Sequence, residues 1–198
     1  MGTFFKLPAV APLTNSSFHQ LKFEVEGLTV KSPLCEICLK NYPLICGNCQ
    51  EKIKEGEITE LDVKVARTLV NLEDLFPSIK NVTFKRVFPI NGVIIVLVGK
   101  GDVRRIIGSS RRVLRQLEEE LNAQVRIVEE SRNPQDILRD LIRPVKILGI
   151  NTIWLPDNSF ERIVRISERE RENIPLTLRQ LQNAIYEMTN ERIRIVFD

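Results

Sequence analysis

The sequence predicts an α+β protein in which a small four-cysteine knuckle precedes two copies of a helix-strand-strand-helix-helix-strand module. Three observations support this prediction. All four cysteines fall within fifteen residues, as two CxxC pairs. Beyond them, helix-like and strand-like stretches follow one another in the same order twice. Short identical segments also recur at matching positions of the two halves.

The composition is that of a folded protein. The chain has 198 residues, of which 43% are hydrophobic and 28% are charged, so a packed core is expected. The longest clean apolar run, residues 93–98, is far shorter than the roughly 18 to 20 residues of a membrane helix. The first twelve residues make a poor signal peptide. We therefore expect a cytoplasmic protein that does not enter the membrane.

Residues 1–30 are predicted to form a flexible arm followed by one strand. Pro8, Pro12 and Asn15 favour irregular backbone, and the alternating stretch 21–26 favours a strand. His19 is the single histidine of the chain and has no partner ligand nearby, so we expect an ordinary surface or packed residue. One histidine also argues against a metallohydrolase centre.

Residues 31–56 are predicted to form the knuckle. Its two pairs are Cys35-Glu-Ile-Cys38 and Cys46-Gly-Asn-Cys49, with seven residues between them and a helix expected over 50–54. Two such turns complete a closed tetrahedral site, which predicts one structural zinc per chain. Two disulfides are the alternative in a secreted protein, and a redox role for the second pair is another.

The first module is assigned to residues 57–132. A helix capped by Thr59 or Glu60 is expected to stop at Pro77. Strands over 82–88 and 93–98 follow, joined by a hairpin at Asn91-Gly92. A short helix over 102–107, a break at Gly108, a helix to residue 121 and a strand over 124–129 complete the module.

The second module is assigned to residues 133–198, where the same order recurs. Leu114-Arg-Gln-Leu117 reappears as Leu178-Arg-Gln-Leu181, and Val125-Arg-Ile-Val128 reappears as Ile193-Arg-Ile-Val196. Identities this short also arise by chance, so that alternative stays open. If the halves are copies, each is expected to hold an antiparallel or mixed three-stranded sheet with helices on one face.

A basic patch surrounds the helix-helix break of the first module. The net charge is only +3, but residues 100–116 hold six cations against one anion. Gly108, Ser109 and Ser110 let a ligand approach the backbone, and the start of the next helix attracts anions such as phosphodiesters. Ile107 is expected to contact unstacked bases. The predicted RNA-binding residues are Lys100, Arg104, Arg105, Ile107, Gly108, Ser109, Ser110, Arg111, Arg112 and Arg115. The alternative is a solvated helix face in which Glu118–Glu120 pair with the arginines.

Residues 59–198 resemble the tandem type II KH domains of NusA-like archaeal transcription factors. The resemblance rests on the module order and on Ile107-Gly108-Ser109-Ser110, where the family has an Ile-Gly-x-x-Gly loop. It implies an elongation or termination factor that binds nascent RNA beside RNA polymerase. Arg111 stands at the family's second loop glycine, where it either adds a phosphate contact or crowds the loop.

The second module is predicted to be degenerate. Its equivalent loop reads Glu172-Asn-Ile-Pro175, with an anion and a proline but no glycine. Residues 161–172 are interpreted as a salt-bridged surface, and Trp154 as a core or interface residue rather than a base-stacking one.

These features favour a non-catalytic RNA-binding protein. No Walker loop, nucleophile elbow or open metal site is recognisable, so neither an enzyme nor a small-molecule substrate is expected. One alternative is a ribosome-associated or ribosome-assembly protein. Another is a protein-interaction adaptor whose KH modules have lost RNA binding.

Overall fold

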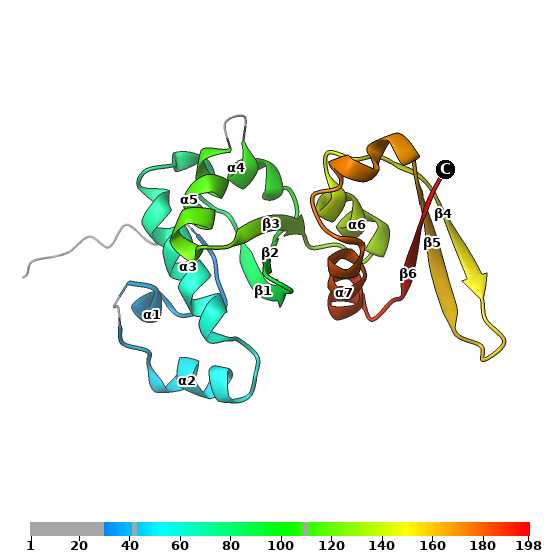
Figure 1. Cartoon of the computed structure of the whole chain (residues 1–198). Helices are drawn as coiled ribbons and strands as arrows, with labels where there is room; N and C mark the ends of the chain where they lie inside the picture. The colour runs from blue at the N-terminus through cyan, green and yellow to red at the C-terminus, as the bar shows by residue number, and fades with distance from the viewer. Residues whose placement is uncertain (1–29, 41–42, 109–110) are drawn as a thin grey trace, which may run out of the picture.

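The structure is a computed structural model that describes residues 30–40, 43–108 and 111–198. It confirms the mixed α+β class, with three strands in each of two sheets (Figure 1). Within these ranges no helix has the length and apolar character needed to cross a membrane. The predicted arm, apart from Val30, lies outside the described residues, as do Ser109 and Ser110.

The first sheet is built by the residues that follow the knuckle. Its elements are α3 (Glu60–Glu73), β1 (Phe84–Ile90), β2 (Val93–Val98), α4 (Val103–Ile107), α5 (Arg112–Leu121) and β3 (Gln124–Glu129). β2 pairs antiparallel with β1 and parallel with β3. The sheet is therefore mixed, and β3 lies at one edge.

Local sequence signals fix several boundaries of the first sheet and its helices. Thr59 caps α3 because its hydroxyl accepts from the Asp62 N–H while Asp62 accepts from the Thr59 N–H. α3 ends at Glu73, before Pro77, which instead begins the 3-10 helix η1 (Pro77–Ile79). Asn91 and Gly92 both have positive φ, 45° and 86°, as the two-residue hairpin turn requires.

The second sheet has the same strand pairing. Its elements are α6 (Pro134–Ile142), β4 (Ile147–Trp154), β5 (Phe160–Ile166), the 3-10 helix η2 (Glu168–Asn173), α7 (Leu178–Thr189) and β6 (Ile193–Phe197). β5 pairs antiparallel with β4 and parallel with β6. The halves differ in that η2 stands where the first half has the α-helix α4, and η1 has no counterpart between α6 and β4.

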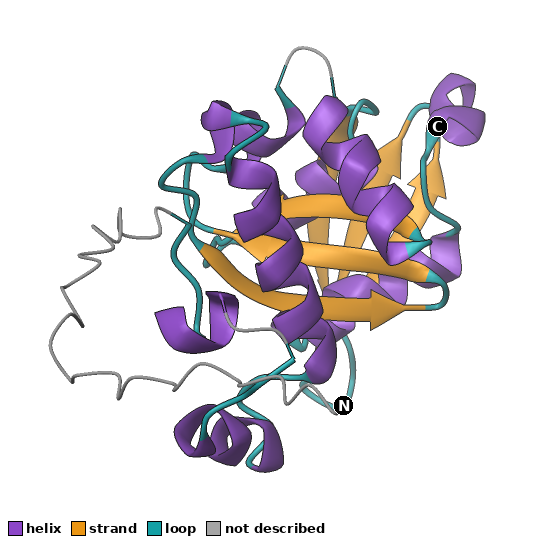
Figure 2. Cartoon of the chain, turned by 90° about the vertical axis from the view of Figure 1, so that its left-hand side faces the viewer, coloured by secondary structure: helices purple, strands orange, loops and turns teal. Residues whose placement is uncertain are grey.

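The first sheet is covered on both faces, contrary to the prediction of helices on one face. Alternate β2 residues Ile94 and Val96 belong to the core under α3 and α5, visible in front of the sheet in Figure 2. Val93 and Ile95 belong to a second core that contains the apolar faces of α6 and α7. β2 is a nearly continuous apolar run because both of its faces are buried.

Candidate zinc centre and nucleic-acid interface

Each CxxC pair lies at the start of a short helix. α1 (Glu36–Lys40) begins just after Cys35 and carries Cys38, whereas α2 (Gly47–Lys54) begins just after Cys46 and carries Cys49. In both turns, the N–H four residues beyond the first cysteine donates to that cysteine's carbonyl. α2 begins at Gly47, three residues before the predicted start at residue 50. α1 was not predicted from the sequence.

The four sulfur atoms form one cluster. All lie within 4.8 Å of one another, and none is in a disulfide. Cys35 Sγ is 3.7 Å from Cys46 Sγ and 3.8 Å from Cys49 Sγ. A tetrahedral zinc with 2.3 Å bonds places its sulfur ligands about 3.8 Å apart. The thiol cluster therefore has the donor set and the spacing that structural zinc requires.

The surroundings of the thiols differ across the cluster. Burial raises the pKa of Cys38 to about 12. A hydrogen bond from the Cys49 backbone lowers the pKa of Cys46 to about 7. The Cys46 N–H also donates to Cys38 Sγ at 3.1 Å, a contact that favours the thiolate. A bound cation would keep all four sulfur atoms ionised and close the site.

The cluster is held against the first sheet's helices. Arg67 of α3 donates from Nε to the Cys38 carbonyl at 2.8 Å and from Nη2 to the Leu44 carbonyl at 2.9 Å. Cys38, Cys49 and Leu39 are buried in the same core as α3. The knuckle and the first module therefore share apolar packing.

The break between α4 and α5 has an unusual backbone at both described ends. Gly108 has φ 52° and ψ −169°, a combination that essentially only glycine adopts. Arg111 has φ 52° and ψ 19°, in the left-handed region. The Arg111 N–H donates to the Ile107 carbonyl at 3.1 Å, which closes the turn. Arg111 thus takes a conformation that glycine would take without strain.

The predicted cations lie on the surface around this turn. Lys100, Arg104, Arg105, Arg111, Arg112 and Arg115 are all exposed, and Ile107 is half-buried against the core. Arg105 is partly engaged, because Nη1 lies 3.6 Å from the buried Asp102 carboxylate and donates to the Lys80 carbonyl. We name the six cations with Gly108 the basic turn.

The acidic run that follows does not neutralise the basic turn. Glu118 instead accepts a hydrogen bond at 3.1 Å from the Val125 N–H at the start of β3. Glu119 and Glu120 are exposed on α5. Among the described residues, no ion pair joins Glu118–Glu120 to these arginines, which argues against the salt-bridged helix face.

The second half offers a different surface at the equivalent position. Ile174, just before Pro175, is extended with φ −67°, so no left-handed turn forms there. The first turn of α7 is capped by its own side chains, because Thr177 accepts from the Gln180 N–H and Gln180 accepts from the Thr177 N–H. By contrast, the Arg111 side chain makes no capping hydrogen bond to α5. The N–H groups at the start of α5 are therefore better placed to bind an anion than those of α7.

Arg126 on β3 adds a positive charge that the sequence analysis missed. Its Nη2 donates to three carbonyls at the end of α6, those of Asp140, Leu141 and Arg143, whereas its buried Nε has no hydrogen-bond partner. Burial lowers the Arg126 pKa, and nearby Arg111 and Arg143 lower it further. Its place in the repeated Val-Arg-Ile-Val segment was the only signal in the sequence.

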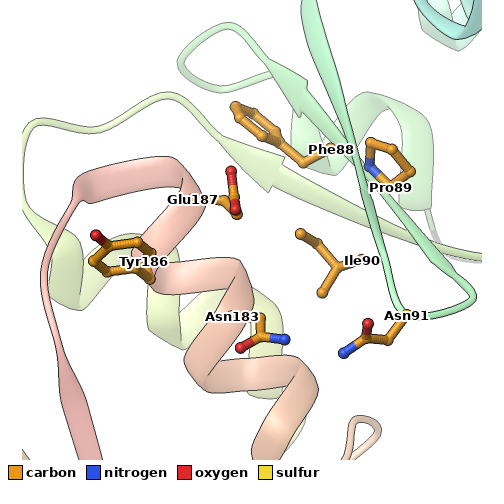
Figure 3. A pocket seen from close by; sticks show the side chains of 7 residues that line it. All are labelled: Phe88, Pro89, Ile90, Asn91, Asn183, Tyr186 and Glu187. Carbon is orange, nitrogen blue, oxygen red and sulfur yellow. The ribbon is translucent and has the colours of Figure 1, made fainter.

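Two hollows of the surface suit a phosphate less well than the basic turn does. A cavity of about 440 Å³ between β1 and α7 is lined by Phe88, Asn91, Asn183, Glu187 and their neighbours (Figure 3). No described lysine or arginine lines this cavity, so it does not suit phosphate. A larger cavity, of about 790 Å³, lies between Lys100 and α6, but its cations face acids such as Asp136 and Asp140.

Two interpretations of the second half have different outcomes. Residues 161–172 do carry ion pairs, such as Arg171 with Glu168 at 3.2 Å and Glu161 with Arg194 at 2.7 Å.

Trp154 is not a core residue, since 72% of it is exposed. It lies near the end of the β4–β5 hairpin, where its ring meets Phe160 edge-on at 5.6 Å. The prediction of core packing is wrong because Trp154 ends a strand that projects past the helices (Figure 1).

Comparison with known proteins adds little to this geometry. No protein-family model matches the sequence, and no curated protein matches it. Among solved structures, the crystal structure of APE1850 is similar, with 23% sequence identity and a TM-score of 0.47. The similarity covers 65% of this chain and 96% of that chain. This level of similarity assigns neither a family nor a function.

Proposed function

We propose that this chain is a non-catalytic RNA-binding protein, built from a zinc knuckle and two tandem type II KH modules, of which only the first binds RNA. The basic turn is the observation that carries the proposal. There a left-handed backbone, exposed guanidinium groups and the start of α5, which the Arg111 side chain does not cap, come together. These are the features that bind a phosphodiester backbone.

The asymmetry between the two halves supports binding by the first module. The α7 end carries a capping box that already pairs the Gln180 N–H, a proline and the anionic Glu172, so it offers a phosphate fewer donors and a less favourable charge than the basic turn does. The basic turn offers the opposite environment. One RNA contact surface per chain is therefore expected.

Binding of a labelled single-stranded RNA of mixed sequence, followed by fluorescence anisotropy, tests the proposal. If about four cations contact phosphates, log affinity falls against log salt with a slope of roughly 3. The variant Gly108→Asp should abolish most binding for two reasons. The new carboxylate repels phosphate, and aspartate tolerates the backbone conformation of Gly108 poorly. Its folding is checked by circular dichroism.

Charge reversal provides a matched comparison. Arg111→Glu with Arg112→Glu should weaken binding by at least about tenfold and flatten the salt slope. Arg169→Glu with Arg179→Glu changes the net charge equally on exposed residues of the second half and should have little effect. Equal losses from both pairs, or no loss from the first, would refute the assignment of RNA to the first module.

The NusA-like role in transcription rests on the sequence resemblance. It predicts that tagged protein co-purifies with RNA polymerase in an RNase-resistant manner. Co-purification with ribosomal subunits would instead favour the ribosome-associated alternative. Folded protein with no salt-sensitive RNA affinity would favour the adaptor.

A further inference from the structure

β4 is an edge strand with an open side. The second sheet has the order β4-β5-β6, and in the described ranges no strand pairs with the outer side of β4. Figure 1 shows the β4–β5 hairpin extending beyond α7. An open edge presents unpaired N–H and C=O groups to any other strand, so natural proteins usually protect it.

The sequence of β4 lacks the usual protection. It reads ILGINTIW, with no charged residue and no proline. Leu148, Ile153 and Trp154 are 60%, 41% and 72% exposed. A register shift between Ile147 and Gly149 disturbs its beginning, which leaves residues 150–154 regular. A regular, apolar, uncharged edge of this kind is suited to pairing with another strand.

The backbone directions show which groups face outward. The Leu155 N–H donates to the Ser159 carbonyl at 2.8 Å, so it points toward β5. Because direction alternates along a strand, Ile150, Thr152 and Trp154 point their N–H and C=O groups to the open side. Arg162 lies opposite Thr152, and its N–H points away from β4, because it donates to the carbonyl of Arg192, just before β6.

We propose that β4 pairs antiparallel with β4 of a second copy of this chain, about a two-fold axis at Thr152. Thr152 is the midpoint of the regular stretch and therefore faces itself across the axis. Ile150 then faces Trp154 of the second copy. All of these residues point their backbone groups outward, so each facing pair exchanges two hydrogen bonds.

The side chains of β4 suit a copy of itself. Thr152 meets Thr152, and a β-branched residue meets an aromatic one, both of which are favourable cross-strand pairs. No like charges oppose one another, because residues 147–154 hold none. Exposed Lys146 precedes β4 and exposed Asp157 follows it, so antiparallel pairing brings the cationic end of one copy to the anionic end of the other. The ends are therefore complementary in charge.

Sedimentation of the full, zinc-loaded chain tests the pairing. So short an interface predicts a reversible dimer with a Kd in the micromolar range, on the order of 10 µM. Ile153→Lys should weaken the dimer at least about tenfold, since an edge lysine opposes strand pairing. Leu178→Lys is the matched control, because Leu178 is equally exposed at 41% but lies on α7. A monomer at all concentrations up to about ten times that Kd, or equal effects of both changes, overturns the proposal.

Cysteine crosslinking tests the position of the axis. Facing Cα atoms in such a pair are about 5.5 Å apart, within disulfide range. Thr152→Cys should therefore give a disulfide-linked dimer on mild oxidation, whereas Glu187→Cys, exposed on α7, should not. Faster dimer formation by Asn151→Cys than by Thr152→Cys would overturn the proposed axis.

Discussion

At the scale of single residues, Arg111 of the basic turn combines a strained backbone conformation with a positive charge. Arg111 has a left-handed backbone, which costs a residue with a Cβ about 1 kcal/mol relative to glycine. Its guanidinium lies close enough to the half-buried Arg126 to lower the pKa of Arg126. A strained, exposed cation beside a second cation has no evident structural benefit, which favours a role in binding an anion.

The two contributions of Arg111 are separable. Arg111→Gly should raise the free energy of unfolding by about 1 kcal/mol because the strain is relieved, and should weaken RNA binding less than Arg111→Glu. Urea unfolding and anisotropy measure the two effects. Asn122→Gly makes the same backbone change at the other end of α5, where φ is 49°, and should leave RNA affinity unchanged. If Arg111→Gly destabilised the protein, the strain argument would be wrong.

The thiols of the zinc-free cluster should differ in reactivity. The thiolate is the reactive form, and Cys46 has a pKa of about 7 and is half-exposed, whereas Cys38 is buried with a pKa of about 12. At pH 7, iodoacetamide should label Cys46 well before Cys38, as read by mass spectrometry. The labelling rate of Cys46 should fall about fivefold at pH 6, because the thiolate fraction decreases as the pH drops below the pKa. Zinc should protect both, and equal labelling without zinc would contradict this order.

At the scale of elements, α1 and α2 are too short to be stable by themselves. They are ordered by the thiol cluster at their starts and by the core they share with α3. Structural zinc contributes on the order of 10 kcal/mol in small peptides, far more than one turn of helix supplies. Metal binding is therefore expected to determine whether residues 33–52 fold.

Loss of one ligand tests this dependence. Cys38→Ser should remove zinc and make residues 33–52 sensitive to protease, while the second half stays folded. Metal analysis and limited proteolysis measure the outcome. Ile37→Ser changes a 65% exposed neighbour on the same helix and should keep the metal. A natural chain without zinc, or with its thiols paired in disulfides, would rule out the zinc centre.

At the scale of the whole molecule, the two modules are not independent. The second face of the first sheet is covered by α6 and α7, so Ile95 and Val128 are buried by residues of the other half. Burial of this kind couples the stability of both sheets. The two modules should therefore unfold as one cooperative unit rather than as two domains.

Truncation of a side chain in the shared core tests this coupling. Leu141→Ala, at a fully buried position of α6, should cost about 2 to 5 kcal/mol and increase hydrogen exchange in β2. Leu148→Ala changes the same residue type where it is 60% exposed and should cost less than about 0.5 kcal/mol. Two separate unfolding transitions, with only the second half destabilised, would contradict a shared core.

Local signals in the sequence determined most of the elements. The hairpin at Asn91-Gly92 and the cap at Thr59 follow from chemistry within four residues, and both are present. The cysteine spacing likewise predicted a cluster that the structure brings together. These features needed no knowledge of distant parts of the chain.

Features that depend on distant residues were decided only by the tertiary structure. The burial of both faces of β2, the exposure of Trp154 and the position of Arg126 against α6 all depend on how the two halves pack. The sequence pattern of β2 fits a strand buried on both faces, yet it does not say what buries it. By itself, the sequence determined the cysteine cluster, the order of the strands and longer helices, and the residues of the basic turn, because each depends on near neighbours. The tertiary structure decided which surfaces remain open, because that depends on contacts between residues far apart in the chain.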